Sequence, residues 1–251
     1  MGVSGEKFYS SADETSMERT IYGVSNYQII HASDQTLEIQ CFDREGQELD
    51  YAVLNARSGR SGAGRFEDVP EEAWYAEAVR WAVDNKVFNG VSDTEFAPDR
   101  SMTRAMFATV LWRMNGSPAP AGPDTFTDVR EGQWYTDAVT WASEQGFITG
   151  YGGAVFGTED SITREQIAAI LFRYTSQAPD MKESAAVRGN LDAFQDCSEI
   201  SEWAAEALSW ASGIHMINGM GGQLLVPKGL ATRAQVATML MNYSRNNPKT
   251  D

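Results

Sequence analysis

Apolar residues recur at helical spacing in six segments of the chain. In residues 74–82 they fall at positions i, i+4, i+7 and i+8, and in residues 107–114 at i, i+3, i+4 and i+7. Both patterns are typical of an amphipathic helix with one buried face. The first pattern returns over 134–143 and 203–212, and the second over 167–174 and 236–243. These stripes predict a mainly α-helical protein.

A set of short motifs appears three times in the same order, at offsets of 60 and then 68 or 69 residues. Each set holds a Phe-x-Asp motif, two tryptophans, a glycine and a Thr-Arg pair. Its members are Asp68, Asp128 and Asp196; Trp74, Trp134 and Trp203; Trp81, Trp141 and Trp210; Gly90, Gly150 and Gly219; and Arg104, Arg164 and Arg233. Constant spacing across so many anchors indicates an internal repeat. We therefore divide the chain into repeats at 66–117, 126–176 and 194–245.

Each repeat is predicted to contain two helices joined by a turn. The glycine is expected to end the first helix, where a residue that tolerates positive φ is favoured. Thr103, Thr163 and Thr232 are expected to cap the second helix, and Gln166 and Gln235 complete a capping box in the last two repeats. One helix pair has only a small core, so the three repeats should pack into a single body.

Residues 1–55 follow a different pattern. Stretches rich in β-formers at 24–32, 36–42 and 48–54, with a polar turn at 43–46, predict a small hairpin sheet. Residues 56–65 are rich in Gly and Ser, which is typical of a flexible linker. The Pro-rich 117–123 segment and the longer polar segment 177–191 separate the repeats.

Composition excludes several classes of function. The formal net charge is −15 and no Lys/Arg run occurs, so DNA or RNA is not an expected partner. The two cysteines and two histidines fit no metal spacing, and no nucleophile elbow or phosphate loop is present. We expect no catalytic residue, metal or cofactor in this chain. No run of about 18 apolar residues predicts a membrane span.

In combination, the Phe-x-Asp-Val, Trp-Tyr and Thr-Arg motifs resemble the surface-layer homology domain. The resemblance covers about residues 66 to 245 and implies a pseudo-threefold body of three helix-turn-helix repeats. It implies noncovalent binding to anionic, often pyruvylated, secondary cell-wall polysaccharide linked to peptidoglycan, and a place on the bacterial cell wall outside the cell. The family's glutamate after Thr-Arg-Ala is missing from all three repeats, and Ala204 replaces the tyrosine of the third Trp-Tyr pair.

The hairpin would then be a fragment of the larger exported protein that is anchored. Residues 27–50 are similar to the closing hairpin of calcineurin-like metallophosphoesterases, although the metal motifs of that family are absent. A hydrolase whose catalytic domain lies outside this chain is therefore an alternative. A structural surface-layer subunit and a protein-docking module are further alternatives.

The candidate ligand-binding residues are the repeated Arg, Asp, Gly and first Trp of each set. The arginines lie in a first helical turn, where the macrodipole disfavours a cation. Two explanations stay open: they bind a ligand carboxylate beside free helix N–H groups, or they form ion pairs with Asp68, Asp128 and Asp196. The tryptophans offer a ring face to a sugar, and the glycines allow a sugar to approach the backbone. Because Ala204 lies in the third repeat, Arg233 is expected to matter least.

Overall fold

The computed structural model describes residues 26–32, 36–43, 48–55, 65–221 and 223–247, with side chains from residue 65 onward. The chain divides into two compact units, Met1–Arg60 and Ser61–Asp251. Residues 44–46 of the predicted turn and residues 56–64 of the predicted linker lie outside the described residues.

The first unit contains an antiparallel sheet of three strands in the order β1-β2-β3: β1 (Asn26–Ala32), β2 (Thr36–Asp43) and β3 (Glu48–Asn55). Ile30 of β1 pairs with Ile39 of β2, and Ile39 pairs with Ala52 of β3. The register shifts between Cys41 and Phe42. The strands lie within about two residues of the predicted β-rich stretches.

The second unit is helical, which confirms the mainly α fold. Its helices are α1 (Ala76–Asp84), α2 (Arg104–Met114), α3 (Thr136–Glu144), α4 (Arg164–Gln177), α5 (Lys182–Ala185), α6 (Ala205–Gly213) and α7 (Arg233–Asn246). Short 3-10 turns are η3 (Pro179–Met181), η4 (Leu191–Ala193), η5 (Cys197–Glu199) and η6 (Glu202–Ala204). The segment between repeats 2 and 3 therefore contains helical turns of its own.

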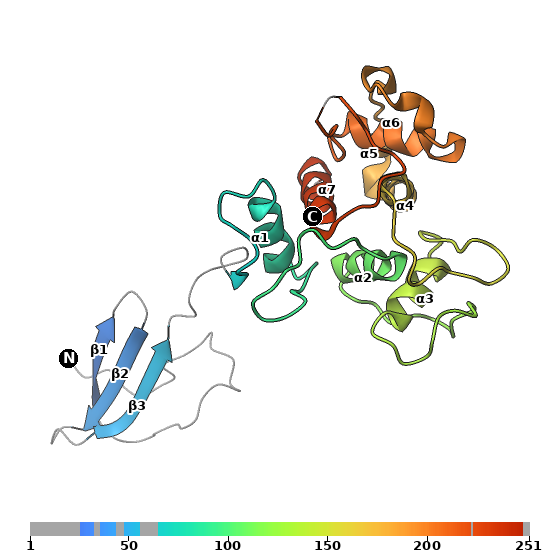
Figure 1. Cartoon of the computed structure of the whole chain (residues 1–251). Helices are drawn as coiled ribbons and strands as arrows, with labels where there is room; N and C mark the ends of the chain where they lie inside the picture. The colour runs from blue at the N-terminus through green and yellow to red at the C-terminus, as the bar shows by residue number, and fades with distance from the viewer. Residues whose placement is uncertain (1–25, 33–35, 44–47, 56–64, 222, 248–251) are drawn as a thin grey trace. The chain divides into compact units, whose positions relative to one another are not determined.

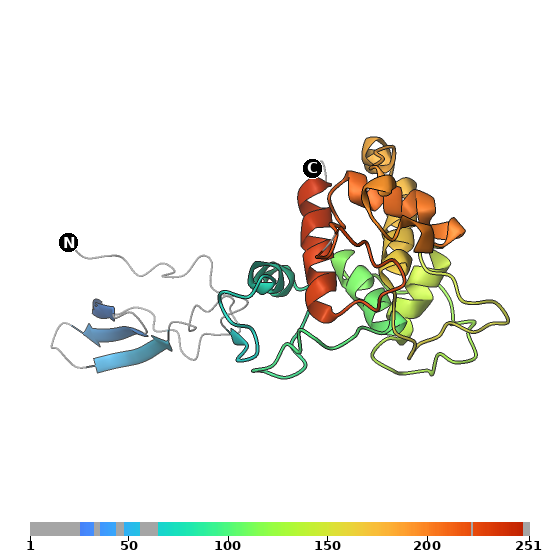
Figure 2. The same ribbon diagram turned by 45° about the horizontal axis from the view of Figure 1, so that its top comes forward.

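Helices pack between repeats more than within them. The second helix of each repeat lies against the first helix of the next: α2 against α3, α4 against α6, and α7 back against α1. Figure 1 shows α2, α4 and α7 at the centre of this unit, with α1, α3 and α6 outside them. Figure 2 shows the long central helix α7 from the side. A repeat is thus not a self-contained helix pair, because its two helices bury their apolar faces against different neighbours.

Three backbone hydrogen bonds close this arrangement just before the central helices begin. The Met102 N–H donates to the Ala231 carbonyl over 3.0 Å, Ala231 donates to Ile162 over 3.0 Å, and Ile162 donates to Met102 over 2.9 Å. Each bond joins a different pair of repeats. The chain therefore forms a closed ring with pseudo-threefold symmetry.

The central helices begin where the threonines predict. The side chains of Thr103, Thr163 and Thr232 each accept a hydrogen bond from the N–H three residues later. The glutamines complete the capping box in α4 and α7. Met106 occupies the same position in α2 and cannot do so. The capping prediction is confirmed in all three repeats.

The predicted ends of the first helices were wrong. These helices end at Asp84, Glu144 and Gly213, several residues before the repeated glycines. The residues with positive φ are Lys86, Gly146 and His215, two residues after each helix. The reversal of the chain therefore occurs at these residues, and the repeated glycines are required for a different reason.

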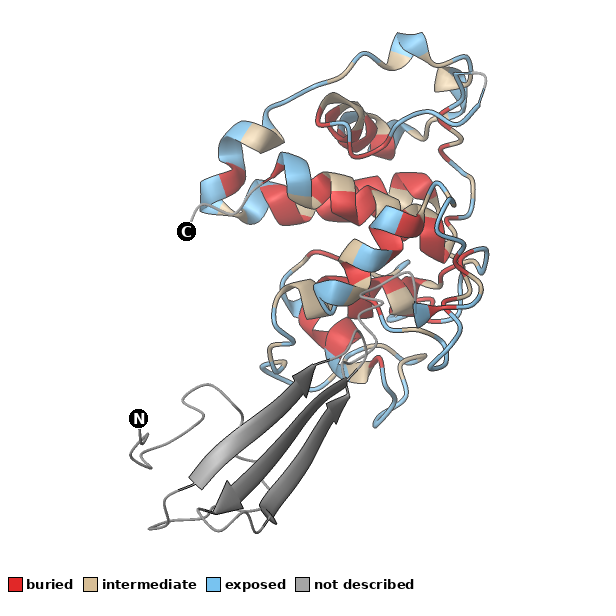
Figure 3. Ribbon diagram, turned by 90° about the vertical axis from the view of Figure 1, so that its left-hand side faces the viewer, coloured by how far each residue is buried: buried red, intermediate tan, exposed pale blue. Residues whose placement is uncertain are grey.

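The core lies between the helices and under the loops that join them. Figure 3 shows buried residues along the inner faces of the helices and exposed residues on the outside. Phe96 and Phe156, from the loops, are fully buried, as is Leu225 at the equivalent position of repeat 3. Trp210 and Trp141 are buried as the stripes predict, whereas Trp81 is only half-buried. This difference coincides with a cavity, described below.

Candidate ligand site at the repeat junctions

The Phe-x-Asp aspartates fix a loop within their own repeat. Asp68 accepts hydrogen bonds from the N–H groups of Phe96 (2.8 Å) and Ala97 (2.6 Å). Asp128 accepts equivalent bonds in repeat 2, and Asp196 in repeat 3. A carboxylate that accepts two backbone N–H groups forms strong, charge-assisted bonds. Each aspartate therefore holds the loop that precedes the second helix.

The arginines cross from one repeat to the next. Arg104 of repeat 1 donates from Nε to the Phe156 carbonyl (3.0 Å) and from Nη2 to the Thr149 carbonyl (2.8 Å) of repeat 2. Arg164 reaches the equivalent carbonyls of Leu225 and Asn218 in repeat 3. We call these contacts the first and second junctions.

Arg233 makes the third junction, between repeats 3 and 1. It donates to the carbonyls of Phe96 (2.7 Å) and Asn89 (2.7 Å), and its guanidinium lies over the Phe96 ring, 4.5 Å from the centroid. The three arginines together form a second ring of contacts between the repeats. This crossing is the part of the site that sequence reasoning missed.

The guanidinium groups are buried but not fully enclosed. Relative exposures are 5% for Arg104, 4% for Arg164 and 8% for Arg233. Their Nη1 nitrogens make no hydrogen bond with any residue in the described part of the chain. In that part, Asp124 Oδ2 is the one fully buried polar side-chain atom without a partner, so the Nη1 nitrogens are not fully buried. Each Nη1 therefore keeps at least a small solvent-accessible surface. Each fixed arginine thus has one nitrogen that no described residue binds.

Burial and hydrogen bonding shift the pKa values of these groups. Burial lowers the pKa of all three guanidinium groups, that of Arg233 to about 10. Burial of the Asp128 carboxylate disfavours its charge, but hydrogen bonds from the N–H groups of Phe156, Gly157 and Thr158 outweigh this effect and lower its pKa. The same balance lowers the pKa of Asp196. All these groups are charged near neutral pH.

The ion-pair explanation of the arginines is wrong, and the ligand explanation stays a prediction but with one detail corrected, the free helix N–H groups. Within residues 65–221 and 223–247, no ion pair joins the arginines to Asp68, Asp128 or Asp196. The adjacent helix N–H groups are not free either: those of Arg104 and Ala105 donate to the carbonyls of Asp160 and Thr158 in repeat 2. Backbone carbonyls of the next repeat are the main partners of the guanidinium groups. The cost of a cation in the first turn is offset by these bonds.

The first tryptophan of each repeat is exposed on the loop before the first helix. Relative exposures are 66% for Trp74, 58% for Trp134 and 59% for Trp203. Trp74 and Trp134 pack edge-on against the next tyrosine, with centroid distances of 5.3 Å and 5.1 Å. Exposed indole rings held in this way leave a flat apolar face free, which suits a sugar ring.

The repeated glycines lie where the backbone passes under the first phenylalanine of the repeat. A Cβ atom on Gly90 would lie 2.3 Å from the Ser92 carbonyl oxygen and 2.5 Å from the Phe66 ring. Gly150 faces the same restriction from Val155 and Phe126, and a Cβ atom on Gly219 would lie 3.0 Å from the Phe194 ring. Close packing within the repeat therefore accounts for these glycines without a ligand.

The crossing of the arginines changes which residues share a site. Arg233 reaches repeat 1, which has the complete Trp74–Tyr75 pair, whereas Arg164 reaches repeat 3, where Ala204 has replaced the tyrosine. The expectation that Arg233 matters least assumed that each site is built from one repeat. The incomplete aromatic pair belongs instead to the second junction.

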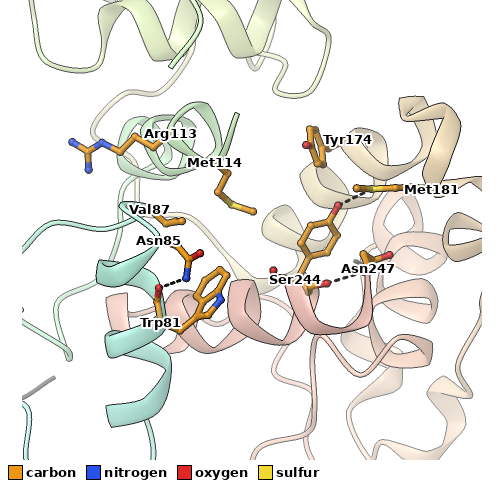
Figure 4. A pocket seen from close by; sticks show the side chains of 10 residues that line it. Trp81, Asn85, Val87, Arg113, Met114, Tyr174, Met181, Ser244 and Asn247 are labelled. Atoms are coloured by element: carbon orange, nitrogen blue, oxygen red, sulfur yellow. Dashed lines mark hydrogen bonds between the residues drawn. The ribbon is translucent and has the colours of Figure 1, made fainter. Parts of the chain in front are cut away.

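A cavity of about 310 Å³ lies at the other ends of the central helices. Trp81 and Val87 line one side and Tyr174 and Met181 the other (Figure 4). The guanidinium of Arg113, which also lines the cavity, points away from it. Because Arg104 begins α2 and Met114 ends it, the cavity is about 15 Å from the first-junction arginine. It is separate from the candidate site.

In the described part of the chain, no cluster of His, Cys, Asp and Glu has a geometry that would hold a metal ion. No helix there is long and apolar enough to cross a membrane.

Two segments of the chain match the model of the S-layer homology domain: residues 65–108 and 125–168. They include most of the first two junction-forming repeats, with Arg104 and Arg164. This match supports assignment of the helical repeats to the S-layer homology family.

Curated relatives point to the cell surface. The chain is 30% identical over 177 residues to "Exoglucanase XynX" of Acetivibrio thermocellus, 70% of this chain and 16% of that protein. It is 29% identical over 149 residues to the "Cellulosome-anchoring protein" of the same species, 57% of this chain and 33% of the relative. A "Surface-layer 125 kDa protein" of Lysinibacillus sphaericus is 29% identical over 198 residues, 76% of this chain and 16% of that protein.

The chain therefore spans a third or less of the length of these relatives. The names of these relatives differ and include an enzyme, an anchoring protein and a surface-layer protein. These similarities support an extracellular, cell-wall-associated location and a role in anchoring at the cell surface.

Proposed function

We propose that the helical body anchors an exported protein to the bacterial cell wall by binding the anionic secondary polysaccharide attached to peptidoglycan, without catalysis. One observation carries the proposal: each junction holds a buried arginine whose Nε and Nη2 are occupied and whose Nη1 is open. Such a group costs little further conformational entropy on binding, because the protein has already fixed it.

The chemistry of the junction favours an anionic sugar. The guanidinium supplies a charge-assisted donor to a carboxylate such as a pyruvyl ketal, and the exposed tryptophan supplies an apolar face to the ring. The net charge of −15 makes the long-range field repulsive toward such a polymer. Affinity must therefore come from local contacts, which is consistent with a site that is built at fixed positions.

Pelleting with purified wall sacculi tests the proposal. We expect the protein to co-sediment with intact sacculi and to stay in the supernatant when acid has removed the polysaccharide. The Gly122→Ala variant is a suitable control, because Gly122 is exposed in the link between repeats and has room for a Cβ atom. Equal binding to intact and stripped sacculi, or none to either, would contradict the proposal.

The N-terminal sheet supports a second element of the proposal, that the anchored cargo is a larger surface protein. The part that aligns with this chain is only 16% of the exoglucanase. A hydrolase such as a metallophosphoesterase, with its catalytic domain outside this chain, is the alternative cargo. This alternative would be favoured if the full-length product hydrolysed a phosphoester and a fragment limited to residues 61–251 did not.

A further inference from the structure

The three junctions are equivalent in backbone but differ in charge beside the arginine. At the third junction, the carbonyl of Arg100 accepts a hydrogen bond from the Arg233 N–H over 2.9 Å, so the two residues are in direct contact. The Arg100 side chain is exposed and makes no ion pair within the described residues. Its charge is near enough to lower the pKa of Arg233, after the larger effect of burial. The third junction therefore presents two cations.

The equivalent of Arg100 differs at the other junctions. At the first junction it is Asp160, whose carbonyl accepts from the Arg104 N–H and whose charge opposes the effect of burial on the Arg104 pKa. Glu159 precedes it. Tyr151 also lies over the Arg104 guanidinium, 4.5 Å from ring centroid to Cζ. The first junction has a complete aromatic pair, but its arginine faces acidic neighbours.

The second junction lacks both features. Gly229 occupies the position of Arg100, and Ala204 follows Trp203 in place of the tyrosine. The buried Glu165 carboxylate accepts hydrogen bonds from the N–H (3.1 Å) and hydroxyl (2.9 Å) of Ser201, just before that tryptophan. Lys228 adds a cation next to Gly229. An anion is therefore opposed here by a fixed carboxylate.

Two acidic residues, Asp68 and Asp99, belong to the part of repeat 1 that forms the third junction. Asp68 accepts the N–H groups of Phe96 and Ala97, and the Phe96 carbonyl in turn accepts from Arg233. Asp99 is exposed. Burial raises the pKa of Tyr75 most, and the charges of Asp99 and Asp68 raise it further. Asp68 therefore holds the loop whose Phe96 carbonyl binds Arg233, and its charge partly opposes the lowering of the Arg233 pKa by burial.

We propose that the third junction is the principal site of this protein, that it takes a sugar bearing a carboxylate, and that Arg100 is the residue that distinguishes it from the other two junctions. Arg233 Nη1 and the Arg100 guanidinium form a two-cation site, and the Trp74 ring supports the sugar. This inference rests on the proposed polysaccharide function and adds which junction carries it.

The test compares three variants that keep the buried network intact. Arg100→Gln removes the distinguishing cation from the surface. Arg80→Gln removes the same charge from an exposed position of α1 and is the matched control. Asp160→Arg installs at the first junction the residue that the third already has. Binding is measured with solubilised wall polysaccharide and with the same material after chemical reduction of its carboxylates to alcohols.

We expect Arg100→Gln to weaken binding about tenfold at low salt, the loss of one charge-assisted contact, while Arg80→Gln binds as wild type does. Asp160→Arg should strengthen binding or add a second molecule of ligand, and the reduced polymer should bind weakly to every variant. Wild-type affinity of Arg100→Gln, or equal affinity for the reduced polymer, overturns the inference while leaving wall binding intact. Failure of the wild type to bind either polymer would instead overturn the proposed function and the inference together.

Discussion

The aspartate loops and the arginine junctions both use a charged side chain to hold backbone groups, but they act over different distances in the chain. Asp68, Asp128 and Asp196 bind N–H groups 28 to 30 residues away, within one repeat. The arginine side chains bind carbonyls between 45 and 144 residues away, always in the next repeat. One set shapes the repeat, and the other joins the repeats into a ring.

This difference shows why the two motifs recur together. The aspartate fixes the loop through its N–H groups, and the arginine of the preceding repeat binds a carbonyl of the same loop. Phe96 shows both contacts, since its N–H donates to Asp68 and its carbonyl accepts from Arg233. Loss of an aspartate should disturb one loop, whereas loss of an arginine should disturb the closure of the ring.

The largest effect is expected from Arg233→Gln. The shorter side chain cannot reach both carbonyls, so the buried Phe96 carbonyl and the partly buried bond to the Asn89 carbonyl lose their donor, and the contact with the Phe96 ring is lost. We expect the free energy of unfolding to fall by about 3 kcal/mol, because one buried and one partly buried hydrogen bond to a charged donor are lost. Denaturant unfolding monitored by tryptophan fluorescence measures this change.

Two further variants sharpen the result for Arg233. Arg233→Lys should not restore stability, because an ammonium group lacks the fork that reaches two carbonyls at once. Arg100→Gln, which alters only an exposed side chain, should stay within about 0.5 kcal/mol of wild type. If Arg233→Gln were as stable as wild type, the arginines would not close the ring.

A smaller effect is expected from Asp128→Asn. The neutral amide offers one oxygen where the carboxylate offered two, and its NH₂ group faces the N–H groups of the loop. We expect a loss of about 2 kcal/mol, typical for hydrogen bonds to a charged acceptor. Hydrogen exchange should show faster exchange at Phe156 and Gly157, with the helices of repeats 1 and 3 unchanged. Equal loosening in all three repeats would show that the loop and the ring are one cooperative element.

The smallest effect is a change of stability with pH. The Asp128 and Asp196 pKa values are lowered in the folded protein, so their contribution is complete above the unfolded value of about 3.9 and is lost as the pH falls through the folded values. The difference in stability between wild type and Asp128→Asn should therefore be constant above pH 5 and shrink below about pH 4. Melting curves from pH 3 to 7 measure it. A difference that does not shrink in acid would mean that Asp128 is not the charged acceptor.

The sequence predicted the helices and caps well because these depend on residues close together in the chain. Thr103 and the stripe behind it are enough to place the start of α2, and the capping boxes of Gln166 and Gln235 follow from spacing alone. Gly90 was misassigned because a glycine in a turn suggests positive φ, whereas here it is the Phe66 ring that leaves no room for a Cβ atom.

The partners of the arginines were not predictable from the same pattern. An arginine in a first helical turn is locally unfavourable, which indicated correctly that it has a special contact. Its acceptors are backbone carbonyls, which every residue carries, so no sequence signal marks Phe96 or Asn89 as the partners of Arg233. Ala204, Arg100 and Gly229 do distinguish the three junctions in the sequence. They could be assigned to a junction only once it was known that each arginine binds the next repeat.

The closed ring also sets an order of assembly. The side-chain bond from Arg104 to Thr149 spans 45 residues, whereas that from Arg233 to Asn89 spans 144. Closing the longer loop costs about 1 kcal/mol more chain entropy, and non-local contacts of this kind form late in folding. Repeat 1 must therefore wait for α7, the last helix of the chain, before its loop carbonyls find their donor. A polypeptide shortened by α7 alone would keep the exposed tryptophan of the third junction but lose its buried cation, so this junction forms only in a chain that extends through Arg233.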